Sequence, residues 1–397
     1  MKFAFFANTD WYLYNFRLST ARRLKAEGHE VVMISPPGEF GARFVEYGFR
    51  WIRLSMDRAS LNPARELLTL RELARVLADE HPDLLHNFTL KCAVYGSLAA
   101  RVANVQTVVN AVAGLGYVFT GNSAKARFLR PVLKMMLRVA LGGRRSLLVL
   151  QNPDDATAFL DAKLIAPEKI RMIRSSGVDT TRFRPLRRRP HEPLRVLMAA
   201  RLLWEKGVQE FVDASSLLRG LGRDIEFLIA GKPDRGNPHS VSAEQMQEWV
   251  NQNLVSWLGH VDDMPALLNS VDVMALPSYY REGVPKCLIE GAACGLALIT
   301  TDRPGCREVV SQDGIDGLRV EVRNAADLAR KILRLDDDRD LLAQLGMSAR
   351  QKALANFDER RVIQQTVDVY DELLYPCTVV KPGVSDVSPE MSYAVLR

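Results

Sequence analysis

The chain has 397 residues, of which 47% are hydrophobic and 25% charged, as is typical of a globular protein of two or three domains. Its formal net charge is +6, and the excess is concentrated between residues 84 and 153, which include no Asp or Glu. The five cysteines form no CxxC pair, which argues against a metal site and indicates free thiols in a reducing compartment. The N-terminal apolar stretch is too short for a signal peptide, and no run approaches the roughly 18 apolar residues of a spanning helix. We therefore expect a cytoplasmic protein that is soluble or lies on a membrane surface.

Two series of apolar runs alternate with helical patterns along the chain. The runs are continuously hydrophobic, which predicts strands buried on both faces, as in parallel sheets covered by helices. We therefore predict an α/β fold of two doubly wound, Rossmann-like domains. The expected strands of the first domain, residues 1–175, are Lys2–Ala7, Glu30–Ser35, Trp51–Ser55, Leu84–Phe88, Thr107–Val112, Leu147–Gln151 and Ile170–Ile173.

One helical pattern of the first domain, between residues 123 and 145, combines a narrow basic face with a broad apolar one. Such a helix is typical of binding to an anionic membrane surface, with about 1 kcal/mol for each Lys or Arg near anionic lipid. The alternative is an ordinary amphipathic helix that packs on its own domain and exposes a basic stripe. We predict contact with an anionic membrane surface. The basic residues concerned are Arg127, Arg130, Lys134 and Arg138, and the apolar positions opposite include Val132, Met135 and Val139.

A Pro- and Arg-rich segment without apolar period, residues 176–193, is the expected linker. The second domain, residues 194–357, repeats the alternation of strands and helices. Residues 358–375 form a last helical pattern, and residues 376–397 are predicted to be a disordered tail. The expected strands of the second domain are Arg195–Ala200, Glu226–Ala230, Val255–Leu258, Val273–Leu276, Ala297–Thr301 and Leu318–Val320.

The stretch "REGVPKCLIEG", residues 281–291, follows a strand of the second domain directly. Pro285 is expected at the first position of a helix, so that Glu282 lies in the loop and Glu290 in the second helical turn. Taken alone, this corner is equally consistent with an ion pair between Glu290 and Lys286 and a solvated Glu282.

Three further loops of the second domain are expected at the same edge of the sheet, because ligands of doubly wound folds bind at the carboxyl ends of the strands. One of them, "AARLLWEKG", adds Arg201 and Lys206. These cations and a helix N-terminus suit phosphate groups, whereas carboxylates suit the hydroxyls of ribose or of a sugar ring. The combination indicates a site for a nucleotide sugar.

These motifs resemble those of the retaining family 4 glycosyltransferases, also called glycosyltransferase group 1. "EGVPKCLIE" is similar to the E-x7-E motif of that family, "RLLWEKG" to its paired Arg and Lys, "TTDRPGCREVV" to its helix-capping loop and "SSGVDTTRFRP" to its interdomain linker. The resemblance extends to about Leu374. "NAVAGLGYVF", "DRGNPHSVS" and "WLGHVDDM" are similar to a bacterial subgroup that acts on polyprenyl-diphosphate-linked sugars.

The resemblance implies the GT-B fold, in which a cleft separates two Rossmann-like domains and a final helix, here residues 358–375, crosses back to the first domain. It implies transfer of a hexose or N-acetylhexosamine, with N-acetylgalactosamine from its UDP sugar in α linkage as our expectation, onto a polyprenyl-diphosphate-linked sugar. No metal or other cofactor is expected, because Arg and Lys stabilise the departing diphosphate. The implied residues are Arg201 and Lys206 for the diphosphate, Glu282 with Gly283 and Val284 for the sugar, Glu290 for the ribose, and Trp257, Leu258 and Gly259 for the base.

The sequence departs from the family pattern in two loops of the first domain. Asp10 stands where many members have a glycine pair, and Ala113 stands about where many have a histidine. Asp10 and His86 are therefore candidates for the acceptor side, with a packed or solvated histidine as the alternative for His86. The run Asp336–Asp338 resembles a metal site, but it lies between two helical patterns and is expected to be a helix cap.

Other functions remain open at this point. A nucleotide-sugar epimerase or a phosphorylase would share the GT-B architecture. A dinucleotide-dependent oxidoreductase would need a G-x-G-x-x-G turn after a first strand, where this chain has "NTDWYL" and "RLLWEK". The basic segment lacks the interleaved aromatic residues of nucleic-acid readers, so no nucleic-acid partner is expected.

Overall fold

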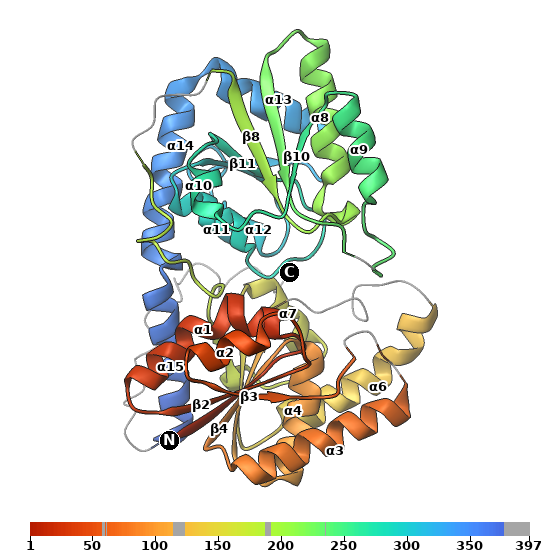
Figure 1. Ribbon diagram of the computed structural model, residues 1–397, viewed down its shortest axis with the longest axis vertical. Helices are drawn as coiled ribbons and strands as arrows, with labels where there is room; N and C mark the ends of the chain where they lie inside the picture. Colours follow the sequence, from red (N-terminus) through yellow and green to blue (C-terminus); the bar gives the residue numbers. More distant parts are fainter. Residues whose placement is uncertain (58–59, 61, 114–123, 187–191, 235, 377–397) are drawn as a thin grey trace, which may run out of the picture.

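The computed structural model describes residues 1–57, 60, 62–113, 124–186, 192–234 and 236–376, without the side chains of residues 124–130. Within these residues there are two parallel sheets, each enclosed by helices (Figure 1). The tail that the sequence predicts to be disordered lies outside the described residues from position 377 onward.

The first sheet has the strand order β3-β2-β1-β4-β5-β6-β7, and all neighbouring strands are parallel. The order changes direction between β1 and β4, the kind of switch point at which doubly wound sheets bind ligands. The strands are β1 (Lys2–Phe6), β2 (Glu30–Ser35), β3 (Arg50–Arg53), β4 (Leu84–Phe88), β5 (Thr107–Val112), β6 (Arg145–Leu150) and β7 (Ile170–Met172).

Helices cover both faces of this sheet. Several begin where a side chain accepts a hydrogen bond from the first turn, as Asn62 and Asn152 do ahead of a proline at the first helical position. The helices are α1 (Asp10–Ala26), α2 (Gly41–Glu46), α3 (Pro63–Glu80), α4 (Leu90–Val102), α6 (Ala124–Leu141), α7 (Pro153–Asp161) and the short η1 (Pro167–Lys169).

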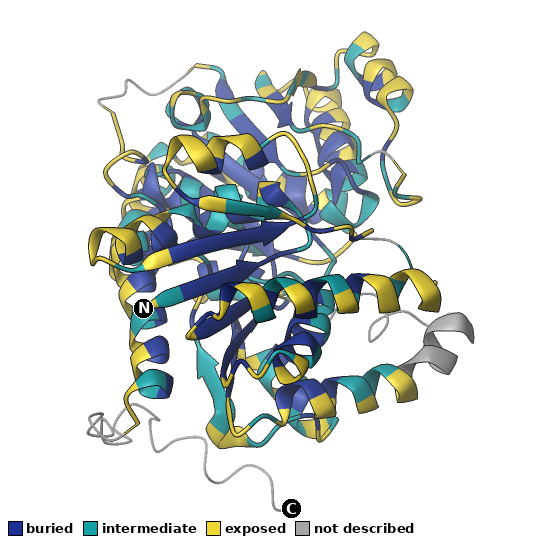
Figure 2. Cartoon of the chain, turned by 60° about the horizontal axis from the view of Figure 1, so that its bottom comes forward, coloured by how far each residue is buried: buried dark blue, intermediate teal, exposed yellow. Residues whose placement is uncertain are grey.

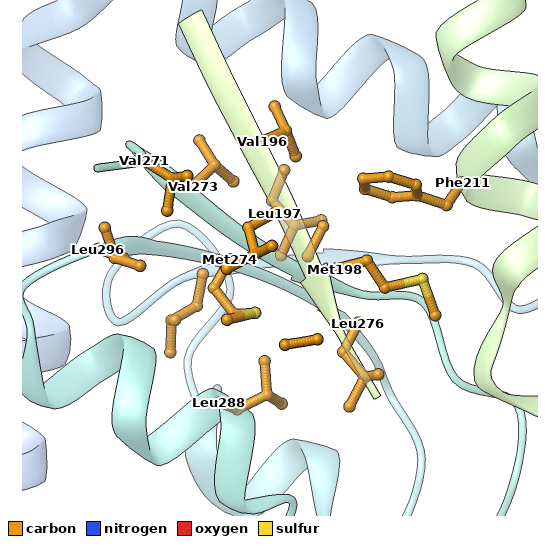
Figure 3. Packing of buried hydrophobic residues seen from close by; sticks show 14 of the residues in the cluster. Val196, Leu197, Met198, Phe211, Val271, Val273, Met274, Leu276, Leu288 and Leu296 are labelled. Atoms are coloured by element: carbon orange, nitrogen blue, oxygen red, sulfur yellow. The ribbon is translucent and has the colours of Figure 1, made fainter. Parts of the chain in front are cut away.

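The second sheet has the order β10-β9-β8-β11-β12-β13, again entirely parallel. Figure 3 shows Phe211 and Leu288, from helices that flank this sheet, packed around its central strands with Val196 and Met274. Its strands are β8 (Leu194–Ala199), β9 (Ile225–Ala230), β10 (Ser256–Gly259), β11 (Val273–Leu276), β12 (Ala297–Thr301) and β13 (Leu318–Val320). Its helices are η2 (Trp204–Lys206), α8 (Val208–Gly220), α9 (Ala243–Asn251), α10 (Met264–Leu268), α11 (Lys286–Ala293), α12 (Cys306–Val309), α13 (Ala325–Asp337), α14 (Arg339–Lys352) and the π-helix η3 (Ala353–Phe357).

The last helix, α15 (Glu359–Leu374), packs on the first sheet rather than the second. Its buried face, including Val369 and Tyr370, shares a core with Phe3 and Phe5 of β1. Figure 2 shows that the central strands are buried along most of their length, whereas the edge strands β3, β7 and β10 are only partly buried.

The expected strands agree with the observed ones to within one or two residues, because strands buried on both faces have an unmistakable apolar run. One local prediction was wrong. Pro285 has an extended backbone, with φ −64° and ψ 121°, and stands just before α11 instead of opening it.

Candidate active site

The corner between β11 and α11 holds a buried pair of opposite charges. The Glu282 Oε1 accepts hydrogen bonds from Lys206 Nζ and, at 2.9 Å, from Ser278 Oγ. The side chains of Lys206 and Glu282 are only 13% and 12% exposed, so solvent screens their interaction little. Two residues that the sequence assigned to one site are thus in direct contact.

The backbone around Gly207 brings these two charges together. Gly207 follows η2 with φ 83°, and a Cβ there would lie 2.3 Å from the carbonyl oxygen of Pro277. Only glycine tolerates both the left-handed conformation and this close approach. The loop after β8, which carries Lys206, is therefore pressed against the end of β11.

Arg201, from the same loop, is more open to solvent. Its side chain is 58% exposed and pairs with Asp234 at 2.8 Å. The pKa of Tyr280 is raised by burial and by Glu282, and the charges of Lys206 and Arg201 both oppose this rise. The Lys206 Nζ lies 6.0 Å from the ring centre of Tyr280. The sequence analysis singled out neither Asp234 nor Tyr280.

Glu290 lies on α11 in a surrounding that disfavours its charge. Burial raises the pKa of its carboxyl group, against the opposing influence of Lys286 and Arg182. Lys286 donates to the backbone oxygen of Asn15 at 2.8 Å, and no ion pair between Lys286 and Glu290 occurs within the described part of the chain. The pair that the corner alone allowed is thus absent, and the ribose role of Glu290 stays a prediction.

The amide groups at the N-terminus of α11 meet the first domain. The Val284 N–H donates to Gln151 Oε1 at 2.8 Å. A Cβ on Gly283 would lie 2.3 Å from that oxygen and 3.0 Å from Ala113 Cβ, so the glycine permits the approach of the two domains. Gln151 follows β6 directly, and its position at a carboxyl strand end was the signal that sequence reasoning overlooked.

Charged pairs reinforce this contact between the domains. Arg281 reaches the buried carboxylate of Asp155 at 3.2 Å, and Arg174 pairs with Glu308 at 2.8 Å. Both pairs join the loop or helix after a strand of the first sheet to the second domain. The structure therefore holds the two carboxyl-end edges against each other.

The predicted base-binding segment belongs to β10, an edge strand of the second sheet. The Trp257 indole donates to the backbone oxygen of Gly231 at 2.9 Å, and the Gly259 oxygen accepts from the Gly231 N–H at 2.7 Å. Leu258 is 38% exposed. Trp257 thus has a structural hydrogen bond that ties β10 to the loop after β9, and contact with a base remains a prediction.

Asp10, proposed for the acceptor side, is buried and accepts hydrogen bonds from the backbone of a neighbouring loop. Its Oδ2 accepts from the N–H groups of Phe40 and Gly41, both at 2.8 Å, and its Oδ1 from that of Trp11 at 2.7 Å. A carboxylate so occupied organises the start of α2, and this geometry gives no support to an acceptor contact.

His86, the other acceptor-side candidate, is also buried. Its Nδ1 lies 2.6 Å from the hydroxyl oxygen of Tyr370, and its ring packs against Phe5 and Phe88. Burial and the charge of Arg17 hold its pKa well below the ordinary range. His86 is thus packed in the core through its ring and Nδ1, and an acceptor-side role for its other ring nitrogen, Nε2, stays a prediction.

In the basic helix α6, part of the predicted apolar face is exposed, and another apolar face is buried. Leu137, Ala140 and Leu141 are buried, whereas Val132, Met135 and Val139, expected on the packed or lipid-facing side, are 50%, 62% and 43% exposed. Arg138 donates to the backbone oxygens of Ala162 and Lys163 at the end of α7. Lys134 is half-buried, and the side chains of Arg127 and Arg130 lie outside the described residues.

The Asp336–Asp338 run is a helix boundary, as expected. Asp338 accepts from the Leu341 N–H at 2.8 Å, and Asp336 pairs with Arg339 at 2.8 Å. In the portion of the chain that the structure describes, no three His, Cys, Asp or Glu side chains are grouped to hold a metal ion. In the same portion no helix is long and apolar enough to cross a membrane.

Two parallel-sheet domains joined at their carboxyl-end edges, with a cation–carboxylate cluster at the junction, define the GT-B class of glycosyltransferases. Solved structures of this class superpose well. A glycosyltransferase from Rickettsia africae has a TM-score of 0.74 at 22% identity and covers 94% of this chain and 98% of its own. Anabaena Alr3699/HepE in complex with UDP and glucose has a TM-score of 0.75 at 18% identity, over 94% of this chain and 99% of its own.

Sequence comparison gives the family. The family described as glycosyl transferases group 1 matches residues 193–338, and glycosyl transferase 4-like matches residues 2–145. The N,N'-diacetylbacillosaminyl-diphospho-undecaprenol alpha-1,3-N-acetylgalactosaminyltransferase of Campylobacter jejuni is 30% identical over 94% of this chain and 99% of its own length. The UDP-Gal:alpha-D-GlcNAc-diphosphoundecaprenol alpha-1,3-galactosyltransferase of Escherichia coli is 25% identical over 78% of this chain and 80% of its own. The chain belongs to the group 1 glycosyltransferases and is an enzyme of that kind.

Proposed function

We propose that this enzyme is a retaining glycosyltransferase that moves a sugar from a nucleotide donor onto a polyprenyl-diphosphate-linked sugar in bacterial glycan assembly. The observation that carries the proposal is the buried Lys206–Glu282 contact, with Arg201 beside it, at the junction of the domains. The names of the two relatives support the acceptor class, since both act on sugars linked to diphospho-undecaprenol. N-Acetylgalactosamine from its UDP sugar, in α linkage, is the donor we expect.

The charge cluster suggests how the donor is activated. An incoming diphosphate competes with Glu282 for the Lys206 ammonium, because a phosphate oxygen is an equally good partner for that cation. Glu282, released from Lys206, then accepts hydrogen bonds from hydroxyls of the donor sugar. Lys206 and Arg201 stabilise the charge that develops on the departing nucleoside diphosphate, and on this proposal no metal ion is needed.

The same site gives the roles of the neighbouring groups. The N–H groups of Gly283 and Val284, at the N-terminus of α11, face the position of the sugar or its phosphate. Gln151 now occupies the Val284 N–H, so donor binding requires that this interdomain hydrogen bond open. Glu290 is proposed to accept from the ribose, and the segment Trp257–Gly259 to line the base.

We propose further that the enzyme works as a peripheral protein on the cytoplasmic face of the inner membrane. The exposed apolar stripe of α6, formed by Val132, Met135 and Val139, supports this. A second exposed apolar pair, Leu67 and Leu68, lies on α3, and both helices pack on α4 (Figure 1). Apolar side chains among basic residues suit an anionic lipid surface, where a polyprenyl-linked acceptor resides.

A panel of radiolabelled nucleotide sugars, incubated with the enzyme and with lipid-linked sugars but without added metal, tests the proposal. Label in the polyprenyl-diphosphate fraction from one donor is expected. Interconversion of donor sugars without an acceptor would instead indicate an epimerase, and phosphate-dependent release of sugar phosphate would indicate a phosphorylase.

A further inference from the structure

Arg17 is a buried cation for which the described residues provide no counter-ion. It lies on the inner face of α1 and is only 5% exposed. Its Nη2 donates to the Tyr12 hydroxyl at 3.2 Å, and its guanidinium carbon stands 4.5 Å above the ring centre of Phe88. The Nε has no hydrogen-bond acceptor, and no carboxylate of the described chain pairs with this guanidinium. Since an unpaired charge is costly to bury, a partner from outside the chain is expected.

The guanidinium borders a small cavity that holds a second unsatisfied polar atom. The cavity has a volume of about 10 Å³, room for roughly one water molecule or one oxygen atom of a larger group. His86 also lines it, and the buried Nε2 of this histidine lacks a partner within the described residues. When the Tyr370 hydroxyl donates to Nδ1, the neutral imidazole carries its proton on Nε2 and can donate it.

The cavity reaches the junction of the domains. Ala113 and Gln151 are part of its lining, and these two residues meet Gly283 and Val284 of the second domain. The cavity therefore lies on the first-domain side of the corner that carries Glu282. Separation of the domains breaks the Gln151–Val284 hydrogen bond, and the Gln151 side chain is then free to leave the cavity edge.

We propose that Arg17, assisted by His86 and the Tyr12 hydroxyl, binds a phosphate oxygen of the acceptor's diphosphate group. This inference rests on the function proposed above, which places a diphosphate-linked acceptor opposite the donor corner. An Arg guanidinium with free N–H groups is the side chain best matched to phosphate oxygens. The diphosphate of the donor and free phosphate have the same chemistry, and the experiment separates these three sources.

The test compares wild type with Arg17→Gln, and uses Arg22→Gln, an exposed arginine of the same helix, as matched control. Each protein is titrated with farnesyl diphosphate, with UDP and with inorganic phosphate. We expect Arg17→Gln to bind farnesyl diphosphate at least about tenfold more weakly and UDP within about twofold of wild type, as removal of one partner of a desolvated charge pair predicts. The control should match wild type for all three probes.

Other outcomes are equally decisive. Loss of UDP binding in Arg17→Gln would show that Arg17 binds the diphosphate of the donor, and it would overturn the acceptor assignment. Wild-type affinity of Arg17→Gln for farnesyl diphosphate would reduce Arg17 to a packing residue, as would a loss confined to inorganic phosphate. In the transfer assay the KM for the lipid acceptor should rise by at least about tenfold while the donor KM is unchanged, a split that a purely structural role would not give.

Tyr12→Phe covers the case in which Arg17→Gln does not fold, because it removes only the hydroxyl that Arg17 contacts. It should weaken farnesyl diphosphate binding and leave UDP binding unchanged; equal affinity for farnesyl diphosphate would contradict the proposal. Farnesol, which has the same tail but no phosphate, should bind the wild type and the variants alike. If the wild type transfers no sugar to any lipid diphosphate, the proposed function fails, and these titrations still decide whether Arg17 binds a diphosphate.

Discussion

The two glutamates of the α11 corner lie in different surroundings. Glu282 is held by Lys206 and Ser278. Among the described residues no ion pair to Glu290 occurs, and burial disfavours its charged form. The first is therefore poised to exchange its cation for a substrate group. Burying the charged carboxylate of Glu290 costs free energy, and a hydrogen bond from a ligand hydroxyl would offset that cost.

Replacing Glu282 separates binding from transfer. Glu282→Gln removes the charge next to Lys206, so the cation stays available to the diphosphate while the sugar loses its acceptor group. We expect transfer to fall by about 100-fold or more, with UDP affinity largely retained in a titration. Glu248→Gln, on the exposed side of α9, is the control, and normal turnover of Glu282→Gln would contradict the sugar role.

Glu290→Gln should stabilise the protein and weaken nucleotide binding together. The folded-state pKa of Glu290 is raised, so its burial destabilises the fold increasingly as pH rises through that pKa, and protonation at low pH relieves the effect. Thermal unfolding should therefore show a gain in Tm for Glu290→Gln that is larger at pH 7 than at pH 4. An unchanged UDP affinity would argue against the ribose role.

The sequence placed Lys206 and Glu282 in one cleft, as observed, but it did not predict the direct contact between them. It overlooked Gln151 at the carboxyl end of β6, and it did not single out Asp234 within a loop that it had placed at the right edge of the sheet. Arg17 did leave a signal. It stands four residues from the buried Leu13 and Ala21, on the inner face of α1, where a lone arginine is unexpected.

At the scale of elements, α6 shows how the packing of its neighbours decides which side of an amphipathic helix is buried. Leu137 and Leu141 pack into the first domain, and the apolar residues left outside form a separate stripe. The helical wheel predicted an amphipathic helix correctly, but it could not tell which apolar residues α4 would cover. The buried residues of the central strands were easier to predict. Both faces of these strands are buried, so no choice between two faces was needed.

The triple change of Val132, Met135 and Val139 to serine tests the membrane role proposed for α6. These side chains are exposed, so the free energy of unfolding should change by only about 0.5 kcal/mol per site or less. Binding to vesicles with anionic lipid, measured by co-sedimentation, should fall at least about tenfold. Leu217→Ser, an exposed position on α8, is the control, and wild-type sedimentation of the triple variant would refute the assignment.

At the scale of the whole molecule, the two sheets are joined by α15 and by contacts between their carboxyl-end edges. The fold was predictable because the apolar runs specify two doubly wound domains. The additional helix at the end of the chain indicates that the chain crosses back to the first domain. How closely the domains approach was not, since it depends on pairs such as Arg281–Asp155 that are far apart in the sequence.

Arg281→Gln should loosen this closed arrangement. It removes the contact of Arg281 with the buried carboxylate of Asp155, and loss of such a charged hydrogen bond costs about 1–3 kcal/mol. Small-angle scattering should give a larger radius of gyration, and the transfer rate should drop while circular dichroism is unchanged. Arg223→Gln, which loses ion pairs with Asp336 and Asp337 inside the second domain, should behave as wild type; an equal effect in both variants would show that the Arg281 contact is not specific.

The measurement that tests the central claim most directly is the transfer of labelled N-acetylgalactosamine from its UDP sugar to a short-chain polyprenyl-diphosphate-linked sugar, by wild type and by Glu282→Gln, in the presence of a metal chelator. We predict a labelled lipid product with an α linkage from the wild type and almost none from the variant. If the wild type releases only free sugar, or if both proteins transfer equally well, the proposed chemistry of the Lys206–Glu282 site is wrong.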